Sequence, residues 1–106
     1  MAYVYQVTFD IRPDQMTELQ IGASLERVLG YLRVLLPGEP GYTSARAMYS
    51  MDYPDRTHLV FQSIWDEWTD LDQHRQSALA EDKVLTEFQP HVTIQDLSVH
   101  VYKEVD

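Results

Sequence analysis

The chain has 106 residues, a formal net charge of −9 and no cysteine. This length predicts one domain, spanning residues 1–106, and the lack of cysteine excludes disulfides, thiolate catalysis and cysteine zinc sites. With 17 acidic side chains against 8 basic ones, the chain lacks the basic footprint that nucleic acid or an anionic membrane surface requires.

The N-terminal half predicts a strand followed by a long helix. Residues 3–11 alternate aromatic or β-branched side chains with others, which is typical of a strand. Pro13, followed by acidic residues, is a helix start signal and predicts a helix that runs to Leu36. Gly22 lies inside this helix and predicts a kink or a break there. Two prolines and two glycines within residues 36–41 end the helix.

The C-terminal half predicts a hairpin, helical segments and a last strand. Turn-forming residues at 52–56 join strands expected at 42–51 and 57–66. Thr69, three residues before an aspartate, has the pattern of a helix N-terminus. The remaining elements are a helical piece over 82–88 and a fourth strand over 94–105.

The predicted order is β-α-β-β-α-β, which is typical of a ferredoxin-like α+β fold. Right-handed crossovers then give a four-stranded antiparallel sheet with the helices on one face. The other face would carry large side chains as well, and such a face favours association. We therefore expect a symmetric homodimer through the open sheet face, with a monomer as the alternative. This expectation rests on large side chains at both faces of the middle strands. On strand two, one face carries Tyr42, Arg46 and Met48, and the other carries Tyr49 and Met51. On strand three, one face carries Val60 and Ile64, and the other carries Leu59, Phe61 and Trp65.

The compartment is predicted from what the sequence lacks. No apolar run approaches the roughly 20 residues that span a bilayer. The N-terminal segment has neither the basic region nor the long apolar stretch of a signal peptide. We expect a cytoplasmic protein.

Trp65 and His74 are the candidate site residues. Trp65 ends the third strand and His74 lies on the next helix, so the two rings can meet in one small cavity. Trp65 could stack on a flat aromatic substrate, or serve as a core residue. His74 could act as a general base, because imidazole titrates near neutral pH, or ligate haem iron. The alternative for His74 is a local hydrogen bond to the backbone or to Ser77.

Other side chains are weaker candidates. Tyr49 and Gln6 are candidate residues for orienting a substrate, and Arg75 is a candidate for binding a carbonyl or carboxylate group of a ligand. Trp68 is expected at the surface or in an interface. No pair of histidines has the spacing of a metal motif, so no metal site is expected.

The sequence resembles the antibiotic-biosynthesis monooxygenase-like domains of the dimeric α/β-barrel superfamily. The resemblance rests on Pro37-Gly38 and Gly41-Tyr42 before strand two, on Trp65 at the end of strand three, and on His74 nine residues later. It implies small homodimers with a cavity between sheet and helices in each subunit. Some members are cofactor-free oxygenases and others degrade haem, commonly with a cavity asparagine. This chain contains no asparagine, and Phe61 stands four residues before Trp65.

The leading hypothesis is a monooxygenase without a bound cofactor that oxidises an aromatic or quinone-like small molecule. Trp65 and His74 would be its catalytic residues, and Phe61, Tyr49, Gln6 and Arg75 would contact the substrate. The alternative is a non-catalytic dimeric module that binds a small ligand or serves in stress. Haem binding or breakdown, with His74 or His91 as axial ligand, is the third hypothesis.

Overall fold

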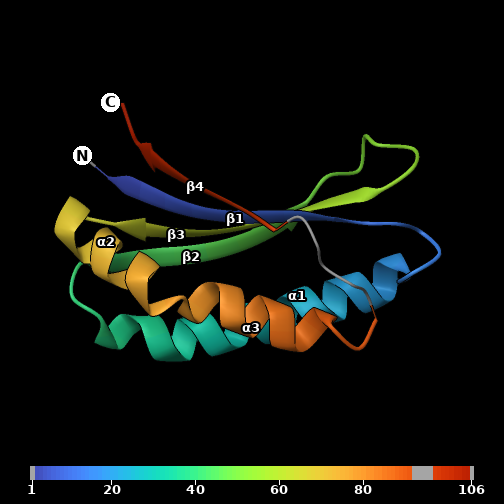
Figure 1. Ribbon diagram of the computed structural model, residues 1–106, viewed down its shortest axis with the longest axis horizontal. Helices are drawn as coiled ribbons and strands as arrows, with labels where there is room; N and C mark the ends of the chain where they lie inside the picture. Colours follow the sequence, from blue (N-terminus) through green and yellow to red (C-terminus); the bar gives the residue numbers. More distant parts are fainter. Residues whose placement is uncertain (1, 92–96, 106) are drawn as a thin grey trace.

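The computed structural model describes residues 2–91 and 97–105, and these residues form one sheet with helices beneath it (Figure 1). The strands are β1 (Tyr3–Ile11), β2 (Tyr42–Tyr49), β3 (Thr57–Trp65) and β4 (Ser98–Lys103). They lie in the order β2-β3-β1-β4, and each pair is antiparallel. This is the predicted ferredoxin-like arrangement, and β2 and β3 form the predicted hairpin. Residues 94–96 of the predicted fourth strand lie outside the described residues.

The helices are α1 (Glu18–Leu35), α2 (Trp68–Ser77) and α3 (Leu79–Phe88), with the short 3-10 turn η1 (Leu36–Gly38) after α1. All three helices lie on one side of the sheet, and the other side is left uncovered (Figure 1). No helix within the described ranges is long and apolar enough to cross a membrane.

The predicted start of the first helix at Pro13 is wrong. Residues 12–15 form a turn closed by the Gln15 N–H, which donates to the Arg12 carbonyl at 3.0 Å. Helix α1 begins after Thr17, whose hydroxyl accepts the Gln20 N–H while the Gln20 side chain accepts the Thr17 N–H. This reciprocal capping box satisfies two N–H groups that would otherwise lack partners. The helix is continuous through Gly22, so the predicted break is also wrong.

The predicted start of the second helix at Thr69 is wrong as well. Helix α2 begins at Trp68 with Glu67 as its N-cap, and no side chain caps it. The connection from β3 is therefore only two residues long, which fixes α2 close to the end of that strand. Ala78 then takes a left-handed conformation with φ 53°, and α3 resumes at once at Leu79 rather than at residue 82.

The core fills the space between the sheet and the helices. Alternate residues of β1 point into it, as the sequence predicted, and side chains of β3, α1 and α3 meet them. These buried residues are Tyr5, Val7, Phe9, Ile11, Leu59, Phe61, Trp65, Ile21, Leu25, Val28, Leu32, Val84 and Phe88.

The open sheet face carries a polar row between apolar neighbours. Arg46 donates to Gln62 at 2.6 Å, Gln62 donates to Gln6 at 2.7 Å, and Gln6 donates to the Tyr102 hydroxyl at 3.5 Å. This row crosses all four strands. Tyr42 was predicted on this side, but a register shift between Tyr42 and Ser44 turns its ring towards Trp65 on the helix side.

Candidate functional site

Trp65 and His74 meet as the sequence predicted. Their ring centroids are 4.7 Å apart with an interplanar angle of 28°, which is a stacked pair. Trp65 is 0% exposed and His74 is 1% exposed. The short connection between β3 and α2 brings the indole under the imidazole, because α2 folds back across the end of the strand.

The Trp65 indole is fixed on three sides. Its Nε1–H donates to the Ser63 hydroxyl at 2.8 Å, and Ser63 lies two residues earlier on the same side of β3. The Tyr42 ring approaches with its edge at 5.9 Å. Trp65 therefore has its polar group satisfied within β3, and its faces are used for packing.

His74 is buried, and polar atoms of its own ring and of Tyr5 lack hydrogen bonds among the described residues. Neither of its ring nitrogens has a hydrogen-bond partner among the described residues, and the hydroxyl of Tyr5 has none either. The Tyr5 and His74 rings lie edge to face with centroids 5.1 Å apart. The nearest charge is Glu39, whose Oε2 lies 3.4 Å from His74 Nδ1. Since buried polar groups in native proteins are normally paired, this cluster is a candidate for binding a polar group.

Burial lowers the pKa of His74 below its ordinary value of 6.5, and the Glu39 carboxylate offsets part of this effect. Desolvation disfavours the imidazolium ion, whereas a carboxylate within a few ångströms favours it. The net result is a neutral imidazole at neutral pH. A neutral imidazole has one nitrogen free to accept a proton.

The lowered pKa of His74 predicts a pH dependence of stability. Below pH 6.5 the unfolded chain binds a proton at this residue that the folded chain resists, so the free energy of unfolding falls as pH drops through 6.5 towards the lower folded pKa. Urea denaturation at fixed protein concentration, between pH 7.5 and 5, measures this fall. His74→Gln should show a shallower fall than the wild type. His91→Gln, which changes an exposed histidine, should keep the wild-type dependence, and equal slopes in all three proteins would contradict the prediction.

The hollow next to this cluster is nearly filled. It lies between the sheet and the helices, and the volume open to the centre of a water molecule is about 10 Å³. That is room for about one water molecule. Phe61 lines it, as expected for a residue on the same face as Trp65. The full lining is Tyr5, Val7, Leu32, Leu36, Phe61, Gln62, Ser63 and Ala80.

Three predicted site residues lie away from this cluster. Gln6 belongs to the polar row on the opposite face of the sheet, because neighbouring strand residues point to opposite sides. Arg75 is turned outward on α2, where it pairs with Asp72 and lies over the Trp68 ring. Tyr49 is opposite Leu59, far along β3 from Trp65. The predicted contacts of these three residues with a ligand in the cavity are not what the structure shows.

Tyr49 lines a different hollow, an open groove of about 710 Å³ between β2 and the start of α1. Its hydroxyl donates to Glu18 at 3.0 Å, and the Glu18 carboxylate raises the pKa of Tyr49 by accepting this bond and by its charge. The groove does not include Trp65 or His74 in its lining.

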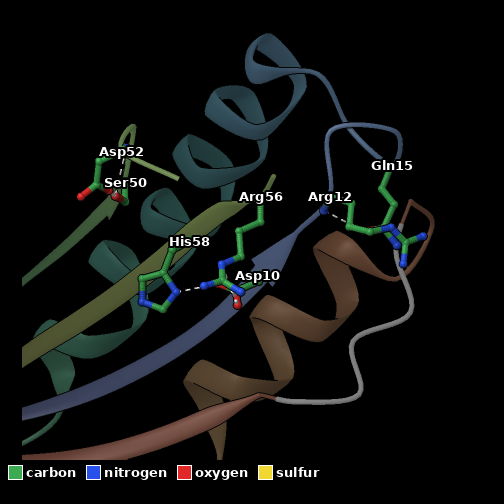
Figure 2. Close-up of polar contacts among 7 residues, drawn as sticks. All are labelled: Asp10, Arg12, Gln15, Ser50, Asp52, Arg56 and His58. Atoms are coloured by element: carbon green, nitrogen blue, oxygen red, sulfur yellow. Dashed lines mark hydrogen bonds and ion pairs between the residues drawn. The ribbon is translucent and has the colours of Figure 1, made fainter. Parts of the chain in front are cut away.

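The other histidines are also separate from His74. His58 lies at the far end of β3, where its Nδ1 is 2.7 Å from Asp10, which also faces Arg56 (Figure 2). His100 is on β4 and His91 follows α3. No group of three or more metal-binding side chains comes together in residues 2–91 and 97–105. The predicted local contact between Ser77 and His74 exists only through the backbone, since the Ser77 hydroxyl donates to the His74 carbonyl at 2.6 Å.

The arrangement does not fit a haem. Trp65 covers one face of the His74 imidazole, and the adjoining space takes about one water molecule. The His74 side chain is 0% exposed, so a macrocycle could reach its nitrogens only if the surrounding core opened, whereas His91 is exposed. His74 is therefore a buried imidazole that contacts Trp65, Tyr5 and Glu39 within the core.

Sequence reasoning missed Tyr5 and Glu39 as site residues. Tyr5 belongs to one of the two alternating sets of the predicted first strand, but nothing in the sequence marks which residue of that set meets the second helix. Glu39 stands between two Pro-Gly pairs and was read only as part of a helix stop. Its contact with His74 joins residues 35 positions apart, and only the folded chain shows it.

Solved structures provide the comparison for this chain. No protein-family profile and no curated protein matches it. A dimeric protein of unknown function and ferredoxin-like fold from Bacteroides fragilis aligns with a TM-score of 0.64 at 16% identity, over 97% of this chain and 96% of that one. A candidate antibiotic biosynthesis monooxygenase from Deinococcus radiodurans aligns with a TM-score of 0.60 at 16% identity, over 100% and 94%.

SnoaB from Streptomyces nogalater, a cofactor-independent oxygenase, aligns with a TM-score of 0.59 at 10% identity, over 99% of this chain and 94% of that one. This chain shares the fold of these proteins. The resemblance to antibiotic-biosynthesis monooxygenase-like domains is thereby confirmed at the level of the fold. The SnoaB structure is of an asparagine-to-alanine variant, and the present chain has no asparagine at all.

Proposed function

We propose that this protein is a cofactor-independent oxygenase that acts on a small aromatic or quinone-like molecule between the sheet and the helices. The observation that carries the proposal is the buried His74 imidazole. Its Nε2 has no hydrogen-bond partner among the described residues, and its Nδ1 lies 3.4 Å from the Glu39 carboxylate. The imidazole is stacked on Trp65 beside the Tyr5 hydroxyl, which also has no hydrogen-bond partner in that part of the chain. The shared fold with SnoaB, a cofactor-independent oxygenase, supports the same reaction class.

The chemistry needs one base and dioxygen. His74 accepts a proton from a ring CH₂ group next to a carbonyl, or from a phenol, which leaves an electron-rich enolate or phenolate. The ring carbon then reacts with dioxygen to give a hydroperoxide. For a CH₂ group, cleavage of the O–O bond with loss of the second C–H proton leaves one oxygen as a new carbonyl, and the other leaves as water. The substrate carbon supplies all the electrons that reduce dioxygen, so the reaction requires no metal or flavin.

Trp65 has a supporting role in this scheme. Its ring holds the imidazole face in place, and its Nε1–H is already bonded to Ser63. A substrate ring would pack against the same apolar walls after Leu32, Phe61 or Ala80 moves outward, since the closed hollow takes only about one water molecule. The proposal therefore favours substrates of one or two rings over larger ones.

Oxygen uptake with a ring-size series tests the proposal. The probes are 2-indanone, 2-tetralone and anthrone, each with an acidic CH₂ group, and the product is identified as the new ketone. The wild type should consume oxygen faster with the two-ring probes 2-indanone and 2-tetralone than with the three-ring anthrone, and His74→Gln should lose about 100-fold in kcat/KM. His91→Gln should retain the wild-type rate. Equal rates for His74→Gln and the wild type, or no uptake above buffer with any probe, would overturn the assignment.

A non-catalytic, ligand-binding dimer is the second candidate. The near-filled hollow and the absence of asparagine favour it. It predicts that 2-tetralone binds and shifts the fluorescence of the buried Trp65 while oxygen uptake stays at the buffer rate. In either case we propose that two copies pair through the open sheet face, a proposal supported by the dimeric Bacteroides fragilis neighbour.

A further inference from the structure

We propose that Glu39 is a positioning residue that fixes the protonation of His74, so that His74 Nε2 and the Tyr5 hydroxyl together bind a hydroxyl group on the ligand. The proposal deepens the proposed function and depends on it only for the reaction that follows binding. This arrangement selects a neutral phenol or enol as the ligand. The hydroxyl proton of the ligand can then reach solvent through His74 and Glu39.

The turn after α1 holds Glu39 against His74. The Glu39 N–H donates to the Leu36 carbonyl at 2.9 Å, and the Glu39 carbonyl accepts the Tyr42 N–H at 3.4 Å. Gly41 then takes φ 80°, and a Cβ at this position would collide with the side chain of Asp70 on α2. The turn can therefore approach α2 closely, and the Glu39 carboxylate comes to lie 3.4 Å from His74 Nδ1.

No other charged side chain in the described ranges lies within ion-pair distance of His74. Arg75, the next residue on α2, pairs with Asp72, and the rings contributed by β1 and β3 are those of Tyr5 and Trp65. A carboxylate accepts hydrogen bonds and cannot donate them when ionised. It therefore favours the tautomer that carries its proton on Nδ1, which leaves Nε2 with a free lone pair.

The two free groups are complementary to a hydroxyl. Tyr5 can donate its O–H and Nε2 can accept a hydrogen bond, and both atoms are buried without a hydrogen-bond partner among residues 2–91 and 97–105. A phenol or enol oxygen accepts from Tyr5 and donates to Nε2. A carboxylate ligand satisfies only the Tyr5 donor and brings a charge into an apolar space, which is costly. An unsubstituted ring leaves both groups unpaired.

Glu39 also connects the buried base to water. The His74 side chain is 0% exposed, whereas the Glu39 side chain is 31% exposed. When the ligand proton moves to Nε2, the imidazolium ion is stabilised by the Glu39 carboxylate. The proton on Nδ1 then passes to Glu39 and from there to solvent, which returns His74 to its neutral form.

Nuclear magnetic resonance of ¹⁵N-histidine in the full chain tests the role of Glu39 without any ligand. In the wild type, the ¹⁵N shifts of His74 should report a proton on Nδ1. Glu39→Gln removes the charge and should lower the pKa of His74 further, by about one pH unit, and Glu39→Asp should restore part of the loss. Glu18→Gln, the same change at the start of α1, should leave the pKa of His74 unaltered. A proton on Nε2 in the wild type, or an unchanged pKa in Glu39→Gln, would overturn the role.

A ligand series tests the hydroxyl site separately. The probes are 2-naphthol, naphthalene and 2-naphthoate, and binding is followed by the change in the ¹⁵N chemical shifts of the His74 side chain. The wild type should bind 2-naphthol about 10-fold or more tightly than either analogue, and Tyr5→Phe should lose this preference over naphthalene. Equal binding of naphthol and naphthalene by the wild type would overturn the hydroxyl site. If both tests succeed but no oxygen is consumed, the oxygenase proposal fails and the assignment of Glu39, His74 and Tyr5 stands.

Discussion

Replacing Trp65 by alanine is expected to lower the free energy of unfolding by about 3–5 kcal/mol. The indole is fully buried, stacks on His74 and satisfies the Ser63 hydroxyl, so its removal leaves a large cavity and an unpaired polar atom. A loss of this size is a large share of the total stability of a small domain. Urea denaturation followed by circular dichroism measures it.

Trp68→Ala is the matched control. Trp68 is 43% exposed, makes an edge-to-face pair with Tyr3 and lies under the Arg75 guanidinium, so its loss should cost about 1 kcal/mol or less. If Trp65→Ala does not fold, Trp65→Phe keeps an aromatic ring and should show an intermediate loss. Equal losses for Trp65→Ala and Trp68→Ala would contradict the central place of Trp65 in the core.

Val60→Lys is expected to convert a dimer of twice 12.4 kDa into a monomer. Val60 lies on the open face opposite Thr8 of β1 and Met48 of β2, beside the polar row that starts at Arg46. In a symmetric pair both copies would bring this lysine into the interface, where a buried, unpaired charge is costly. The dissociation constant should rise by about 100-fold or more.

Val34→Lys is the control for the dimer test, because Val34 lies on α1 and is 79% exposed. Sedimentation velocity at equal protein concentrations should give a dimer for the wild type and for Val34→Lys. A wild-type particle of 12.4 kDa, or a Val60→Lys protein that remains dimeric, would contradict pairing through this face.

The fold could be predicted where the sequence pattern is set by local geometry. The period of two in β1 predicted a strand, and the hairpin turn predicted the pairing of β2 with β3. The helix starts were harder, because two signals competed: Pro13 pointed to an early start of α1, whereas Thr17 and Gln20 form the actual capping box. A capping box satisfies backbone N–H groups directly, so it decides the boundary.

The candidate site was predictable only in part. Trp65 and His74 meet because a short connection leaves α2 little choice of position. Gln6 could have been rejected from the sequence, since strand alternation already places it opposite to Tyr5. Tyr42 could not be assigned to its side, because the register shift in β2 has no clear signal in the sequence. The Glu39 contact depends on how the turn after α1 packs on α2, which is a tertiary property.

The most direct test of the central claim, that His74 is a buried base for ring substrates, is hydrogen–deuterium exchange of 2-tetralone under nitrogen. The CH₂ signal between ring and carbonyl is followed by ¹H nuclear magnetic resonance in D₂O, so proton removal is measured without dioxygen. We predict that the wild type and His91→Gln accelerate the exchange about 100-fold over buffer, and that His74→Gln does not. Exchange at the buffer rate with the wild type, or equal acceleration by His74→Gln, would contradict the claim.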